Sequence, residues 1–132
     1  MQISLKDDLP FISIFLSYAG QATEIYDVLI DTGSVSTVLA ADVVATLGIT
    51  PAPTDELRIL RGVGGTEAVF SRIVDFLRIG DFGIPNFEIE IGGMDYGFAI
   101  NGILGMDFLT QVGAIIDLNT LSLESYRSNT KA

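Results

Sequence analysis

The sequence of 132 residues contains neither cysteine nor histidine. The absence of cysteine excludes disulfide bonds and thiol nucleophiles, and the absence of histidine excludes catalytic Ser/His and Cys/His pairs. Because these two residue types also supply the usual ligands of zinc, we expect no metal site. Carboxylates are the side chains that remain for general acid and base chemistry.

Positive charge is also scarce. Lysine and arginine number 7 against 17 aspartates and glutamates, which gives a formal net charge of −10. A nucleic-acid-binding protein meets phosphates with cationic side chains, and an anionic membrane surface attracts the same residues. We therefore expect neither nucleic acid nor a membrane among the partners of this chain.

Long hydrophobic runs are missing, and residues 1–8 lack the basic and apolar segments of a secretion signal. We expect a soluble chain, cytoplasmic by default, that could still be a piece of a longer protein. Its length suits one domain with a substantial core, spanning residues 1–132 with a flexible tail at about 128–132.

Strand patterns dominate the first third of the chain. Apolar residues occupy both faces of residues 9–18 and recur along 22–30, which predicts two strands, the first of them an inner one. Residues 40–48 predict a brief helix that ends at Gly48. Two prolines within residues 49–54 predict a loop.

A glycine-rich segment, Gly62-Val63-Gly64-Gly65-Thr66, separates β-rich stretches at 56–61 and 67–79. It predicts a hairpin with a flexible tip. The pattern Gly-x-Gly-x-x-Gly fails because Glu67 occupies its last position, and the segment does not open a helix. We therefore expect no dinucleotide. No other cofactor is expected for this chain either.

The last third of the chain continues the β pattern. Residues 84–91 predict a strand whose wet face carries Glu88 and Glu90. A short helix is expected at 106–111, and residues 112–126 predict a closing hairpin. The expected fold class is therefore all-β.

One acid stands apart from the others. Asp31 follows an apolar run and precedes Thr32, Gly33 and Ser34, so it lies where a core strand meets a tight turn. A carboxylate that is desolvated on one side and surrounded by donors is typical of a reactive group. The remaining candidates lack this context and are expected on the surface or in turns: Asp7, Asp8, Asp42, Asp75, Asp81, Asp95 and Asp117.

The segment Ile30-Asp31-Thr32-Gly33-Ser34 resembles the catalytic loop of aspartic proteases, in which an apolar strand precedes Asp-Thr/Ser-Gly-Ser/Ala. These proteases also carry an apolar-apolar-Gly segment that opens a short helix, and Gly102-Ile103-Leu104-Gly105-Met106-Asp107-Phe108-Leu109 resembles it. The single-lobe, retropepsin-like members are the best match. The resemblance implies a closed half-barrel of six or seven strands, with one or two short helices and a flap hairpin.

Only one Asp-Thr-Gly is present, so the resemblance implies that two copies of the chain build one site in a homodimer. Asp31 would be the catalytic acid, and the two Asp31 carboxylates would share one proton. Thr32 would interlock with the opposite loop, Gly33 would admit the substrate backbone, and Ser34 would hydrogen-bond the carboxylate. The implied activity is that of an aspartic endopeptidase, which hydrolyses an extended peptide with activated water.

The resemblance also assigns the glycine-rich hairpin. Its tip, formed by Gly62, Val63, Gly64 and Gly65, would be the flap that closes over bound peptide. A plain surface hairpin is the alternative for this segment.

The second motif would support the site from below. Gly105 would let two crossing segments approach, and Ile103 and Leu104 would be core residues. Retropepsin-like proteases commonly carry Arg and Asn after this glycine, whereas this chain has Met106 and Asp107. Any polar clamp made by that arginine is absent here.

Two readings compete with a homodimeric protease. Asp31 could be a buried acid that caps its own turn. The whole chain could also be a retropepsin-like binding or dimerisation module that does not cleave peptide.

Overall fold

The computed structural model describes residues 1–62, 65–93 and 99–125, which are mostly β-structure with two short helices. The large sheet contains β1 (Ser4–Lys6), β2 (Leu9–Tyr18), β3 (Gln21–Ile30), β4 (Val38–Ala40), β5 (Leu57–Gly62), β6 (Gly65–Ile79), β7 (Phe82–Gly92) and β8 (Gly102–Leu104). The other elements are α1 (Ala41–Val44), the 3-10 turn η1 (Ala45–Leu47), α2 (Met106–Gln111), β9 (Ala114–Asp117) and β10 (Ser122–Ser125).

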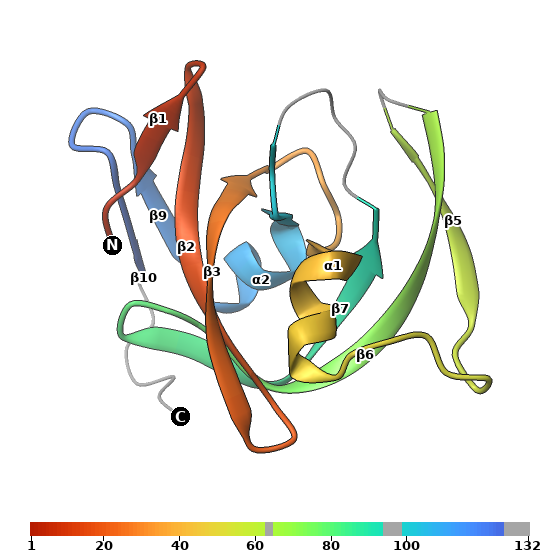
Figure 1. Cartoon of the computed structure of the whole chain (residues 1–132). Coiled ribbons are helices and arrows are strands. Elements are labelled where there is room, and N and C mark those ends of the chain that lie inside the picture. The colour runs from red at the N-terminus through yellow and green to blue at the C-terminus, as the bar shows by residue number, and fades with distance from the viewer. Residues whose placement is uncertain (63–64, 94–98, 126–132) are drawn as a thin grey trace.

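Eight strands form the large sheet in the order β1-β2-β3-β8-β4-β7-β6-β5, and β2 also pairs with β6 (Figure 1). The described residues thus contain more sheet strands than the six or seven expected. One reason is β1, whose three residues are all exposed. A fully exposed strand leaves no apolar alternation in the sequence from which it could be predicted.

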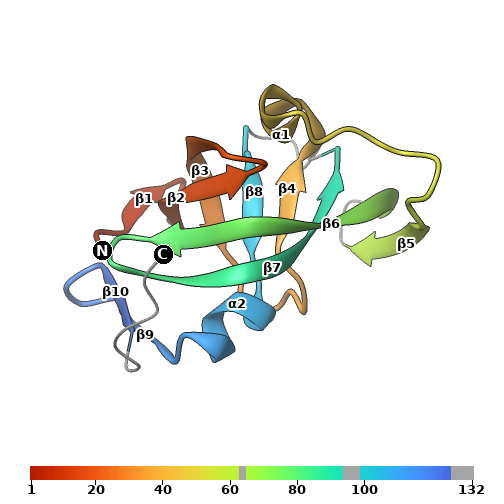
Figure 2. The same ribbon diagram turned by 90° about the horizontal axis from the view of Figure 1, so that it is seen from below.

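The centre of the sheet brings the two sequence motifs together. Strand β8 lies between β3 and β4, parallel to β3 and antiparallel to β4 (Figure 2). In this register Ile30, the last residue of β3, faces Leu104, the last residue of β8. Asp31 and Gly105 therefore follow adjacent strands at the same edge of the sheet.

The core accounts for most of the apolar patterns in the sequence. Strand β2 is an inner strand, as predicted, and Ile14 and Leu16 on it are fully buried. The other large side chains with almost no exposure come from nearly every part of the chain: Ile3, Ile25, Leu39, Ile49, Leu77, Ile79, Ile89, Ile91, Leu104 and Phe108. Burial of this apolar surface is the main favourable term that holds the short strands in place.

The helical segment at 41–47 ends at Gly48, as predicted. Gly48 adopts a left-handed conformation with φ of 84°, and its N–H donates to the carbonyl oxygen of Ala45. Glycine adopts this conformation without the steric cost that a Cβ atom brings. The chain then enters the proline-containing loop that precedes β5.

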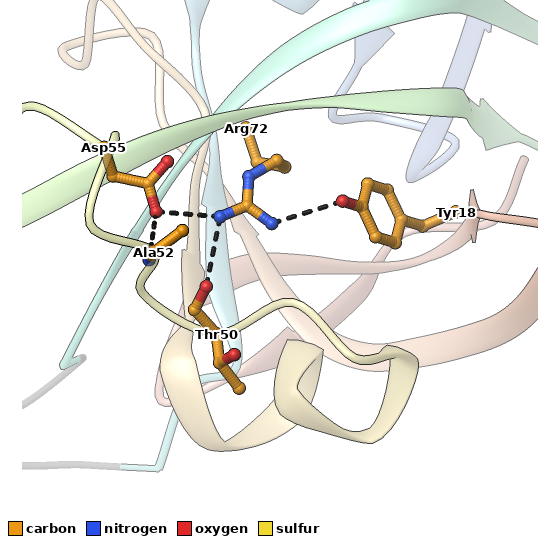
Figure 3. Close-up of polar contacts among 5 residues, drawn as sticks. All are labelled: Tyr18, Thr50, Ala52, Asp55 and Arg72. Atoms are coloured by element: carbon orange, nitrogen blue, oxygen red, sulfur yellow. Dashed lines mark hydrogen bonds and ion pairs between the residues drawn. The ribbon is translucent and has the colours of Figure 1, made fainter.

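Arg72 on β6 holds that loop against the sheet (Figure 3). Its guanidinium donates to the Thr50 carbonyl oxygen at 3.0 Å and to Asp55 Oδ2 at 2.8 Å, and it reaches the Tyr18 hydroxyl at 3.2 Å. The Tyr18 hydrogen bond, followed by the contacts with Asp55, raises the pKa of Arg72 above its ordinary value. Arg72 thus ties the loop before β5 to strand β6.

One expectation about β7 is wrong. Glu88 is exposed, but Glu90 is only 5% exposed, although both were expected on a wet face. Glu90 contacts Ser36 and Arg58, which come from segments distant in the sequence. Alternation along one strand cannot reveal a face that another segment covers.

The ends of the described chain lie side by side in the structure. The N–H of Ile3 donates to the carbonyl oxygen of Leu121, and the N–H of Leu123 donates to that of Met1. Strands β9 and β10 form the predicted closing hairpin. Within the described residues, no helix is long and apolar enough to cross a membrane.

Candidate active site

Asp31 is the first residue after β3 and is partly buried. Its N–H donates to the carbonyl oxygen of Leu104 at 3.0 Å, which joins it to the end of β8. Its Oδ1 accepts the N–H of Gly33 at 2.9 Å, and its carbonyl oxygen accepts that of Ser34 at 3.2 Å. The backbone on both sides therefore fixes the position of this carboxylate.

The other residues of the Asp-Thr-Gly-Ser turn differ in their contacts. Thr32 and Gly33 are exposed, so both are accessible to a second molecule. The Ser34 hydroxyl donates to the carbonyl oxygen of Ser36 at 2.7 Å, whereas a bond to Asp31 was expected. The expectation is wrong for this chain because a backbone acceptor two residues further on satisfies the hydroxyl.

Gly105 lies directly beneath this loop. A Cβ atom at position 105 would lie 2.4 Å from the carbonyl oxygen of Ser36 and 3.0 Å from that of Ser34. The next N–H group, that of Met106, donates to the Ser34 carbonyl oxygen at 2.8 Å. Only a residue without a side chain allows the two segments to approach so closely.

The residues before Gly105 are core residues. Ile103 is 5% exposed and Leu104 is fully buried. They lie on β8, which pairs with the strand that precedes Asp31. The segment therefore supports the loop by packing and by backbone hydrogen bonds.

Asp107 makes a second connection that sequence reasoning missed. Its Oδ2 accepts the N–H of Thr37 at 3.1 Å, and its Oδ1 accepts the Thr37 hydroxyl at 2.8 Å. Thr37 is fully buried, and its hydroxyl oxygen accepts the N–H of Gly105. The sequence carries no signal for this contact, because an acid in the first turn of a helix is common for electrostatic reasons alone.

The two motifs thus lie in contact: Asp31 follows the end of β3, and Gly105 and helix α2 lie beneath the loop after it. The family model for aspartyl proteases matches residues 17–108, a range that includes both motifs. The chain belongs to the aspartyl protease family. Asp31 and the Thr32-Gly33 pair that follows it lie within the matched range.

A solved structure supports the same fold. A retropepsin-like aspartic protease from Rickettsia conorii superimposes with a TM-score of 0.66 at 20% sequence identity. The match covers 92% of this chain and 95% of that one, so the retropepsin-like fold extends over nearly the whole aspartyl protease chain. Comparison with curated proteins gives no significant match.

The hairpin expected to be the flap of this aspartyl protease is formed by β5 and β6, with Gly62 paired to Gly65. Val63 and Gly64, the rest of the expected tip, lie outside the described residues.

Two apolar side chains of this hairpin are exposed. Leu57 and Ile59 are 69% and 63% exposed and lie on one face of β5. This face also carries the buried Phe70, which is paired with Leu57. The hairpin therefore presents apolar side chains to its surroundings.

The remaining acidic candidates are exposed, as expected. Asp75 Oδ2 accepts the N–H of Gly20, and Asp117 Oδ1 accepts two backbone N–H groups in the β9–β10 turn. The others in this group are Asp7, Asp8, Asp42 and Asp81. Asp95 lies outside the described residues.

We expect replacement of Asp107 by alanine to lower the free energy of unfolding by about 2 kcal/mol, because it removes the acceptor of the buried Thr37 N–H. The matched control is Asp117→Ala. Asp107 accepts the N–H groups of Thr37 and Phe108, and Asp117 likewise accepts two backbone N–H groups, but in an exposed turn. Solvent replaces these bonds, so we expect a loss below about 1 kcal/mol. Urea denaturation measures both, and equal losses would contradict the role given to Asp107.

Proposed function

We propose that this aspartyl protease is an endopeptidase whose site forms when two copies of the chain bring their Asp31 carboxylates together. The observation that carries the proposal is the position of Asp31, which is held by backbone hydrogen bonds at the end of a central strand. A single Asp-Thr-Gly in the sequence means that one copy supplies one acid. A symmetric dimer supplies the second.

Charge repulsion determines how such a pair would work. Two carboxylates about 3 Å apart repel by roughly 5 kcal/mol at an effective dielectric constant of 20. The two carboxylates cannot be ionised at the same time near neutrality. The pair therefore shares one proton, as is known for aspartic protease dyads. One carboxylate is then a base and the other an acid.

The proposed reaction uses these two states. The ionised Asp31 takes a proton from a water held between the carboxylates, and the oxygen of that water attacks the scissile carbonyl carbon. The protonated Asp31 of the other copy donates a hydrogen bond to the carbonyl oxygen, which becomes the oxyanion of the tetrahedral intermediate. As this intermediate collapses, the Asp31 that took the proton from water gives it to the amide nitrogen, and the C–N bond breaks to release the amine. The pair is again left with one proton, and no acyl-enzyme forms.

The other site residues act in support of this reaction. In the proposal Thr32 interlocks with the loop of the second copy, Gly33 admits the substrate backbone, and Gly105 keeps the loop close to α2. The hairpin whose strands end at Gly62 and Gly65 closes over an extended peptide as a flap. The proposal also treats residues 1–132 as one domain with a closed half-barrel, and the pairing of β2 with both β3 and β6 supports it.

A non-cleaving binding module is the second candidate. Two observations favour it: Met106 replaces the usual arginine, and Asp107 is engaged with Thr37 of its own chain. Neither residue then supplies a polar clamp for a partner chain. A dimer with a loose contact here would hold the two carboxylates too far apart to share a proton.

The deciding experiment is cleavage of a denatured protein between pH 4 and 7, with and without a pepstatin-type inhibitor, over a series of enzyme concentrations. The protease proposal predicts inhibitor-sensitive fragments and a specific activity that rises with the fraction of dimer. Sedimentation at the same concentrations gives that fraction. A preparation that is dimeric but cleaves nothing would favour the binding module.

A further inference from the structure

Glu90 on β7 is a buried carboxylate that the reaction above does not use. Its side chain is 6% exposed. Burying a charge in a protein is unfavourable unless the charge has an opposite partner and hydrogen bonds. The partners of Glu90 therefore indicate why the acid is there.

One side of Glu90 contacts the loop that carries Asp31. The Ser36 hydroxyl donates to Glu90 Oε1, and the backbone N–H of Glu90 donates to the carbonyl oxygen of Thr37 at 2.9 Å. The Ser36 carbonyl oxygen in turn accepts the Ser34 hydroxyl. Glu90 thus fixes the second half of the loop from the side, while Gly105 and Asp107 hold it from below.

The other side of Glu90 contacts the hairpin. The Arg58 guanidinium lies 2.5 Å from Glu90 Oε2. Glu90 Oε2 has no hydrogen-bond partner among the described residues, so its contact with Arg58 is an ion pair. Arg58 belongs to β5, whereas Glu90 belongs to β7, so the arginine reaches across β6.

The strand register explains how Arg58 can reach so far. Arg58 is paired with Val69, and Glu90 is paired with Ser71, so all four side chains share one face. Val69 is only 1% exposed, although it shares this face with the exposed Arg58. The long arginine stem can cover apolar surface while its charged end meets the carboxylate.

We propose that Glu90 is a positioning residue that couples the β5–β6 hairpin to the Asp31 loop through the chain Arg58–Glu90–Ser36. The inference rests on the proposed function, in which the hairpin is the flap and the loop carries the catalytic acid. Movement of β5 away from β7 separates Arg58 from Glu90 and leaves a buried negative charge beside Ser36. The loop is then held in place only while the hairpin is docked.

Hydrogen exchange of the wild-type chain and its variants tests this coupling directly. We expect Arg58→Gln to raise the exchange rates of the amides at residues 33–37 by about ten-fold, because Glu90 loses its counter-charge. Arg58→Lys, which keeps the charge, is expected to recover most of the protection. The matched control is Arg72→Gln, which removes another arginine ion pair of the hairpin, that with Asp55, and is expected to leave residues 33–37 unchanged.

A double variant separates coupling from general loss of stability. Glu90→Gln removes the charge that Arg58 neutralises but keeps an oxygen that can accept the Ser36 hydroxyl. Combined with Arg58→Gln, it is expected to restore protection of the loop toward that of the Glu90→Gln variant alone. Unchanged exchange at residues 33–37 in Arg58→Gln, or additive effects in the double variant, would overturn the coupling.

Kinetics then relate the coupling to catalysis. We expect Arg58→Gln to lower kcat by about ten-fold with little change in KM, because a displaced loop misplaces Asp31 in the transition state. Arg58→Lys is expected to restore kcat. If the kcat of Arg58→Gln equals that of the wild type, the positioning role of Glu90 is contradicted. If the wild type cleaves no peptide but the variants show the expected changes in hydrogen exchange, only the proposed protease function is contradicted.

Discussion

Replacement of Asp31 by asparagine is expected to lower kcat/KM for peptide cleavage by at least about 10⁴-fold, the scale seen when a central catalytic group is removed. Asparagine keeps the size of aspartate and an oxygen that can accept the Gly33 N–H. It cannot ionise or carry the shared proton, so water activation is lost while the turn remains. Peptide cleavage under the conditions optimal for the wild type measures the effect.

The control for this variant is Asp75→Asn. Asp75 is an exposed acid that also accepts a backbone N–H, in this case that of Gly20 at 3.3 Å. The same chemical change at this position is expected to leave cleavage unaltered. Comparable activity of Asp31→Asn and the wild type, with dimerisation intact, would remove the protease proposal.

Mixing the two forms tests whether one site needs two chains. If wild-type and Asp31→Asn chains are refolded together in equal amounts, random pairing leaves about a quarter of the dimers with two intact acids. Activity should then fall to about half of that expected from simple dilution of the wild type. Activity that matches simple dilution would show that each site is complete within one chain.

Elements whose pattern lies within their own residues could be predicted from the sequence. Strand β2 and helix α2 have the expected bounds, since each depends on periodicity and turn residues within the element itself. The Asp31 and Gly105 segments could be found because each is a short contiguous motif. Their juxtaposition follows from the pairing of β3 with β8.

Contacts between distant segments could not be predicted in the same way. The hydrogen bonds from Thr37 to Asp107 join residues 70 apart, and the one from Ser36 to Glu90 joins residues 54 apart. Alternation placed Glu90 in solvent because the pattern along one strand carries no information about Arg58, which reaches Glu90 across β6. These contacts depend on the completed sheet, and they determine how rigidly the Asp31 loop is held.

Replacement of Gly105 by alanine is the stability change for which we expect the largest effect, about 3 to 4 kcal/mol. The backbone at Gly105 has φ of −98°, which any residue adopts, so the substitution carries no conformational penalty. The added Cβ atom would nevertheless lie 2.4 Å from the Ser36 carbonyl oxygen and 2.5 Å from its carbon. These are backbone atoms, so the loop or α2 must move as a whole.

Gly48→Ala provides the opposite case and serves as the control. Gly48 has φ of 84°, and nothing lies within 4 Å of a Cβ atom built there, so alanine suffers only the conformational cost. That cost is about 1–2 kcal/mol. Chemical denaturation of both variants compares the steric cost at position 105 with the conformational cost at position 48.

The two outcomes differ in what they say about the site. If Gly105→Ala loses no more stability than Gly48→Ala, the loop can move away from the added methyl group, and the close approach beneath Asp31 does not hold the site together. If it loses more, cleavage measured on the fraction that remains folded should also fall, because the displaced Ser36 carries the Ser34 hydrogen bond and the contact with Glu90.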